Sequence, residues 1–159
     1  MVLRLLSREY RWSRAQRDSA MAVLTTNRAK WIAFRPRTYE YRERGWCFCY
    51  SMWEGPRLLV IQDARLVTAT DTSRRMVDSA YTKAFRGKVA GIDALFAAVA
   101  EGLRDTTIAV VRASYDAVHG YPVSITYDRS VTVSDDEYHV DVSHVRVIPF
   151  VSPAAARLP

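Results

Sequence analysis

Residues 31–49 read WIAFRPRTYEYRERGWCFC, and within them the sequence changes from a helical pattern to a strand pattern. Trp31 belongs to a helix expected over about residues 19–34, which must end before Pro36 because proline disfavours helix in the residue preceding it. Residues 37–51 are rich in Tyr, Trp and Phe, which predicts a strand. The segment therefore predicts a helix that leads directly into the first strand of a sheet.

The rest of the chain continues with strands and one further helix. Short apolar runs predict strands at residues 58–62 and 65–70, and apolar side chains at i, i+3, i+4 and i+7 predict a helix at residues 92–103. Three more strands are expected over residues 107–115, 121–127 and 138–147. The last strand changes phase after Ser143, which predicts a bulge. We expect an α+β fold: a mostly antiparallel sheet of about six strands, in helix-βββ-helix-βββ order, covered by helices.

Length and composition favour one domain with its own core. The chain has 159 residues, of which 49% are hydrophobic and 25% charged, as is ordinary for globular proteins. No apolar run approaches the roughly 18 residues of a membrane-spanning helix. We expect a basic amphipathic arm over residues 1–18, a single α+β domain over 19–148 and a Pro/Ala-rich tail over 149–159.

The net charge of +6 is unevenly distributed along the chain. Eleven Lys or Arg stand against four Asp or Glu through Arg44, whereas the remainder is nearly neutral. In the first 17 residues Arg recurs every three or four positions opposite apolar side chains, which predicts a basic amphipathic helix. We expect this arm to bind a protein partner or to pack on the domain itself, with a targeting segment as the alternative. The candidate partner-binding residues are Arg4, Arg8, Arg11, Trp12 and Arg14.

Cys47 and Cys49 form the candidate disulfide. In a regular strand their side chains face the same way, with Cα atoms roughly 6.5 Å apart, which is near the upper limit for a disulfide. In an oxidising compartment we expect the bond, and in a reducing compartment two semi-buried thiols. A zinc site would need two more ligands among His119, His139 and His144, and the spacing fits no known zinc module.

Residue patterns for other chemistry are few. The sequence contains no Gly-x-Ser-x-Gly motif and no glycine-rich phosphate loop. Asp135, Asp136 and Glu137 lack the spacing and the glycine of a calcium loop, and we interpret them as the turn before the last strand. We therefore expect no enzymatic activity, no cofactor and no metal.

A pattern spread over roughly residues 28–147 resembles the signature of an uncharacterised family. It consists of Trp31, Tyr39, Tyr41, Cys47, Cys49, Gly120-Tyr121-Pro122 and Asp135-Asp136-Glu137. The family contains small, mostly bacterial secreted proteins and lipoproteins of unknown function. The resemblance implies a fold and a non-catalytic role, and it supplies no substrate or cofactor.

Two features depart from the family's pattern. Asp63-Ala64-Arg65 occupies a turn that usually carries Gly. Residues 1–18 are not expected to be an export signal or to carry a lipidation cysteine, so the family's envelope location does not transfer directly.

These observations predict a non-catalytic binding or accessory protein that acts through protein–protein contacts, as a subunit of a larger assembly. The first alternative is an exported envelope protein with a Cys47–Cys49 disulfide, which binds a small ligand or an envelope component. The second is nucleic-acid binding through the basic arm, where cations lie beside aromatic side chains. The sequence leaves cytoplasm, organelle matrix and envelope open as compartments.

Overall fold

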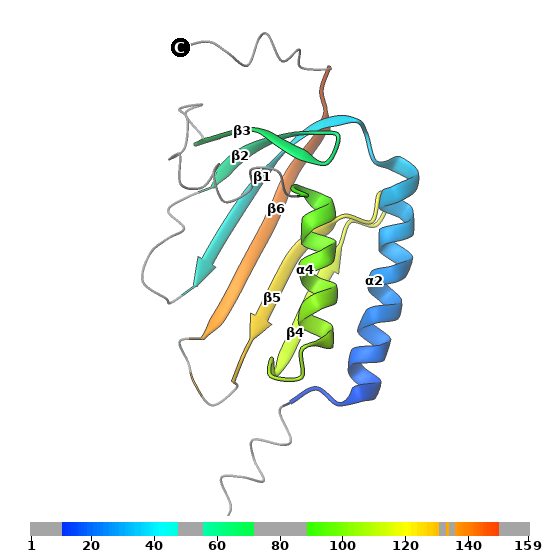
Figure 1. Ribbon diagram of the computed structural model, residues 1–159, viewed down its shortest axis with the longest axis vertical. Helices are drawn as coiled ribbons and strands as arrows, with labels where there is room; N and C mark the ends of the chain where they lie inside the picture. Colours follow the sequence, from blue (N-terminus) through cyan, green and yellow to red (C-terminus); the bar gives the residue numbers. More distant parts are fainter. Residues whose placement is uncertain (1–10, 48–55, 72–88, 131–132, 134–135, 150–159) are drawn as a thin grey trace, which may run out of the picture.

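The computed structural model describes residues 11–47, 56–71, 89–130, 133 and 136–149. Within these residues the chain forms two helices and six strands in the predicted helix-βββ-helix-βββ order (Figure 1). The elements are α2 (Arg14–Phe34), β1 (Thr38–Cys47), β2 (Arg57–Gln62), β3 (Arg65–Asp71), α4 (Ile92–Arg104), β4 (Val110–Tyr115), β5 (Pro122–Asp128) and β6 (Glu137–Val147).

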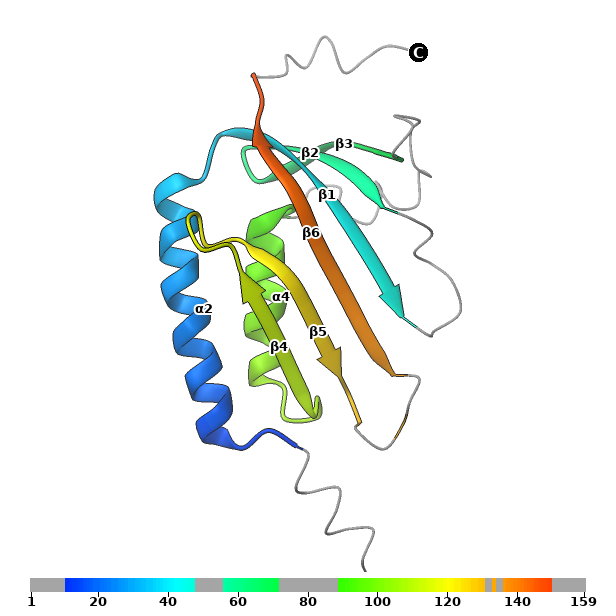
Figure 2. The same ribbon diagram turned by 180° about the vertical axis from the view of Figure 1, so that it is seen from behind.

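The strands form one open sheet in the order β3-β2-β1-β6-β5-β4, and each neighbouring pair is antiparallel. Both helices lie on one face of this sheet, as the front and back views agree (Figure 2). The predicted α+β class and the antiparallel sheet are therefore confirmed. The sheet face opposite the helices carries polar side chains such as Arg42, Arg112 and Asp141, whereas β2 places Leu58 and Val60 on it.

Helix α2 begins at Arg14, about five residues before the predicted start. The cause is a capping box: the Ser13 hydroxyl accepts from the backbone N–H of Gln16, and the Gln16 side chain accepts from the N–H of Ser13. The helix is continuous through residue 18, the predicted limit of the arm. Residues 1–10, which carry most of the predicted arm helix, lie outside the described residues.

The bulge predicted after Ser143 is confirmed. Glu40 on β1 pairs with Arg146, but Arg42 pairs with Ser143, so β6 contains one extra residue between these pairs. His144 takes a left-handed conformation there, with φ of 55°. This inserted residue explains the change in hydrophobic phase, because it moves the following side chains to the other face.

The core lies between the sheet and the two helices. Trp31 of α2, Tyr39 of β1 and Phe96 of α4 are almost completely buried in it, and the rings of Trp31 and Tyr39 meet edge to face with centroids 5.3 Å apart. The Tyr39 hydroxyl accepts a hydrogen bond from the backbone N–H of Ile92 at 3.0 Å. Gly91 precedes this contact with φ of 71°, and a Cβ there would overlap the Tyr39 hydroxyl. The first strand thus fixes the position at which α4 starts.

Candidate functional site

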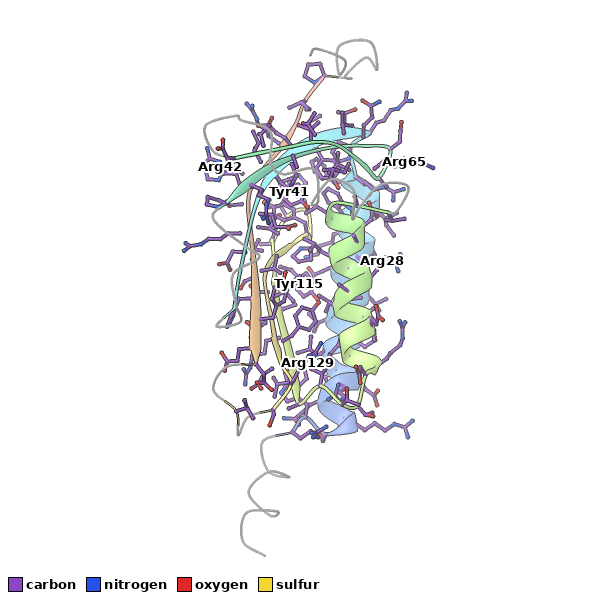
Figure 3. The ribbon with its side chains drawn as sticks, turned by 60° about the vertical axis from the view of Figure 1, so that its left-hand side comes forward. Arg28, Tyr41, Arg42, Arg65, Tyr115 and Arg129 are labelled. Carbon is purple, nitrogen blue, oxygen red and sulfur yellow. The ribbon has the colours of Figure 1, made fainter. Side chains whose placement is uncertain are left out.

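A pocket of about 240 Å³ lies between α4 and the covered face of the sheet. Figure 3 views this layer from the side, and Tyr41 lies in it between the sheet and the helix. The wall on the helix side is formed by small and apolar residues: Ala90, Gly91, Ala94, Leu95 and Ala98. The wall on the sheet side is formed mainly by Tyr41, Leu59, Ile61, Ile125, Tyr127, Tyr138 and Val140.

The strand pleat determines which side chains reach this pocket. On β1, Tyr41 and Glu43 point towards the helices, whereas Arg42 between them is exposed on the other face. The register pairs Tyr41 with Leu59 and Glu43 with Arg57. The space remains open because the α4 residues above it include alanines, whose side chains do not span the gap.

One end of the pocket is polar. The Tyr41 hydroxyl donates to Oε2 of Glu43 at 3.0 Å in a buried hydrogen bond. Glu43 and Arg57 face each other on neighbouring strands, and each is only 8% exposed. Burial, together with the nearby Glu43 carboxylate, raises the pKa of Tyr138 to about 12. The phenols of Tyr41 and Tyr138 and the carboxyl group of Glu43 therefore line this part of the pocket, whereas Arg57, opposite Glu43 in the register, is not a lining residue.

A second hollow of about 360 Å³ adjoins the pocket. Ala98, Tyr127 and Tyr138 line both spaces. We call this hollow the acidic groove, because its charged lining residues are Glu101, Asp105, Asp136 and Arg129. An apolar space and an acidic one thus meet along the C-terminal half of α4.

Of the predicted partner-binding residues, the described ones, Arg11, Trp12 and Arg14, do not line this pocket. Arg4 and Arg8 lie outside the described residues. Arg11 and Trp12 contact the connection between α4 and β4. Nη1 of Arg11 donates to the carbonyl of Thr106 at 2.6 Å, and the backbone N–H of Trp12 donates to the carbonyl of Ala109 at 2.9 Å.

Arg14 differs from these neighbours. Its side chain is 96% exposed, and its Nε lies 3.8 Å from Oδ2 of Asp18 one helical turn later. An exposed ion pair of this kind contributes little to stability. Among the described candidates, Arg14 is therefore the one whose side chain is directed into solvent.

Arg17, in the same stretch, has a buried guanidinium that the sequence pattern does not distinguish from the other arginines. It donates to backbone carbonyls at the end of α4 and in the connection that follows, namely those of Gly102, Leu103, Asp105, Ile108 and Ala109. These include carbonyls that the helix leaves unpaired at its C-terminus, and a cation there also complements the helix dipole. Arg17 thus joins the start of α2 to the end of α4.

The predicted sulfur site is only partly described. Cys47 is the last residue of β1, and Cys49 lies outside the described residues, so the disulfide stays a prediction. His119, His139 and His144 lie at three separate places: the β4–β5 turn, the first part of β6 and the bulge of β6. Among the described side chains, no group of three or more His, Cys, Asp or Glu could hold a metal ion.

The described signature residues near α2 act in packing. Gly120 takes φ of 75°, and a Cβ there would overlap the carbonyl of Asn27. The Asp116 carboxylate accepts from the N–H groups of Val118 and His119, which shapes the β4–β5 turn. The turn can therefore approach α2 closely because position 120 has no side chain.

Comparison with known proteins identifies a family. The sequence profile of the Family of unknown function (DUF6174) matches residues 23–147. No curated protein and no solved structure matches the chain. No helix among the described residues is long and apolar enough to cross a membrane.

Proposed function

The chain belongs to the Family of unknown function (DUF6174), and from its own geometry we propose that it is a binding module for a small, largely apolar ligand held between α4 and the sheet. The observation that carries this proposal is the pocket of about 240 Å³, whose walls are mostly apolar and include a few polar side chains, among them the hydrogen-bonded pair Tyr41 and Glu43. Binding sites for small molecules commonly combine these two properties. The proposal agrees with the alternative in which the protein binds a small ligand.

The polar end supports binding more than catalysis. The Glu43 carboxylate already accepts a hydrogen bond from Tyr41 and lies opposite Arg57. The phenol of Tyr138 is protonated at neutral pH, and its pKa of about 12 makes it a still poorer acid than an ordinary tyrosine, so it can orient a ligand but is not a base there. We propose that these groups orient a bound molecule and perform no reaction on it.

The test is a fluorescence titration with N-phenyl-1-naphthylamine, a neutral probe that brightens in apolar surroundings. We expect saturable binding to the full chain. Ala94→Phe should abolish it, because Ala94 lines the pocket and a phenyl ring would occupy the space. Ala97→Phe is the matched control on the same helix, since Ala97 is exposed and does not line the pocket. Equal binding by both variants would refute the proposal.

A second proposal is that the basic N-terminal residues contact a protein partner. The exposed side chain of Arg14 favours it. Deleting residues 1–10 leaves the contacts of Arg11, Trp12 and Arg17 in place, so the fold should survive. We expect a partner that co-purifies with the full chain to be lost from this deletion and from Arg14→Glu. Retention of the partner by both variants would exclude this function.

A further inference from the structure

The pocket and the acidic groove lie next to each other along α4. Tyr127 and Tyr138 project from neighbouring strands, pair directly in the register and line both spaces. Their ring centroids are 6.1 Å apart. A molecule whose apolar part fills the pocket would therefore have its other end beside these two rings and the groove.

The groove has an excess of negative charge among its described residues. Three carboxylates, on Glu101, Asp105 and Asp136, stand against the guanidinium of Arg129 and that of Arg17, which is not a lining residue but donates to the carbonyls of Asp105 and Ile108 there. The Asp105 carboxylate is held ionised, because hydrogen bonds from the side chain and the N–H of Thr107 lower its pKa. The groove therefore favours a cation over an anion.

Two buried oxygen atoms at this junction accept no hydrogen bond from the described part of the chain. They are the hydroxyl oxygen of Tyr127 and Oδ1 of Asp136. Burying such atoms without a partner is unfavourable, and a ligand that donates hydrogen bonds would remove the penalty. An ammonium group can donate to the carboxylates that line the groove, and aromatic faces such as those of Tyr127 and Tyr138 also attract cations.

We propose that the ligand is a protonated amine with an apolar body, whose body lies in the pocket and whose ammonium group lies between Tyr127, Tyr138 and Asp136. This inference rests on the proposed function and names the chemical class of its ligand. A carboxylate of the same size would face three like charges in the groove. A neutral alcohol would gain the apolar contacts without the charge attraction.

The experiment displaces bound N-phenyl-1-naphthylamine with hexylamine, hexanol or hexanoate at pH 7.5 and low salt. These competitors share one apolar body and differ in the charge of the head group. We expect hexylamine to compete at about tenfold lower concentration than hexanol, with hexanoate the weakest. Equal potency of the three, or stronger competition by hexanoate, would overturn this inference while the proposed function stands. Failure of the probe itself to bind would overturn the proposed function instead.

Variants that each remove one negative charge from the acidic groove test whether the ammonium group binds there. Asp136→Asn and Glu101→Gln should each raise the hexylamine concentration needed to displace the probe by about threefold to tenfold. The hexanol concentration needed should stay unchanged. Asp141→Asn is the control, because Asp141 is exposed on β6 and does not line the groove. Glu101 is exposed on α4, so its variant keeps the test valid if Asp136→Asn impairs folding. Unchanged hexylamine competition in Glu101→Gln and in a folded Asp136→Asn would contradict the proposal.

Discussion

The hydroxyl oxygen of Tyr39, at the start of β1, accepts a hydrogen bond from the backbone N–H of Ile92, the first residue of α4, at 3.0 Å. The two residues are 53 positions apart, and both are almost completely buried. The N–H of Ile92 is one of the donors that a helix leaves unpaired at its N-terminus. Tyr39 therefore fixes the position of the N-terminal end of α4, which lies over the pocket.

Removing this hydroxyl should destabilise the fold. We expect Tyr39→Phe to lower the free energy of unfolding by about 1–3 kcal/mol, because the buried N–H of Ile92 loses its acceptor. Denaturant unfolding followed by circular dichroism measures the change. Tyr115→Phe is the control in the same layer, where Tyr115 stacks against Phe96, and we expect a smaller loss. Equal losses of unfolding free energy in the two variants would contradict the predicted contribution of this hydrogen bond.

The buried guanidinium of Arg17 should contribute more than any exposed arginine of the same helix. Arg17→Met retains much of the apolar stem but leaves carbonyls such as those of Leu103 and Ile108 without their donor. We expect a loss of about 2–4 kcal/mol in the free energy of unfolding. Arg14→Met, at a fully exposed position of the first turn, should change it by less than about 0.5 kcal/mol.

The β2–β3 turn contains a conformation that glycine would adopt more easily. Asp63 and Ala64 have φ values of 49° and 58°, as in the two-residue turns that favour Gly. We expect Ala64→Gly to raise the free energy of unfolding by about 0.5–1 kcal/mol. The same change at exposed Ala97 in α4 should lower it by about 1 kcal/mol, since glycine is unfavourable inside a helix. A destabilised Ala64→Gly variant would contradict the described turn.

Alkaline pH should destabilise the protein through its buried tyrosines. Burial raises the pKa of both Tyr115 and Tyr138 from 10.0 to about 12. The folded state then holds protons that the unfolded chain releases, so the stabilisation is complete below pH 10 and is lost as the pH rises towards 12. Tyrosinate absorbance and denaturant unfolding across this range measure the effect. If these phenols titrate near pH 10 in the folded protein, the predicted alkaline loss of stability is ruled out.

The sequence predicted the element order because alternation and helical spacing are local patterns. The bulge in β6 could be located at Ser143 from the change of phase alone. Residue type alone does not identify the buried face of α2, because the apolar side chains of Val23 and Ile32 are 51% and 55% exposed. Leu24 and Trp31, seven residues apart, face the core instead, and the partners that select this face come from distant strands.

The pocket could not be predicted, since it depends on how far α4 stands from the sheet. One signal was nevertheless available. Glu43 follows Tyr39 and Tyr41 at two-residue spacing, so strand alternation directs its carboxylate towards the core. A charged residue at an inward position needs a partner, and the register supplies Arg57. That pairing lies between strands and therefore could not be derived from one strand's pattern.

The central claim is that a ligand enters the space under α4, and methyl NMR tests it most directly. The full chain, labelled at alanine methyl groups, is titrated with N-phenyl-1-naphthylamine. Saturable shifts of the Ala94 and Ala98 methyl signals, with little change at Ala97, are the predicted result, because the first two line the pocket. Probe fluorescence that rises to saturation while the Ala94 and Ala98 signals stay unmoved would contradict the account.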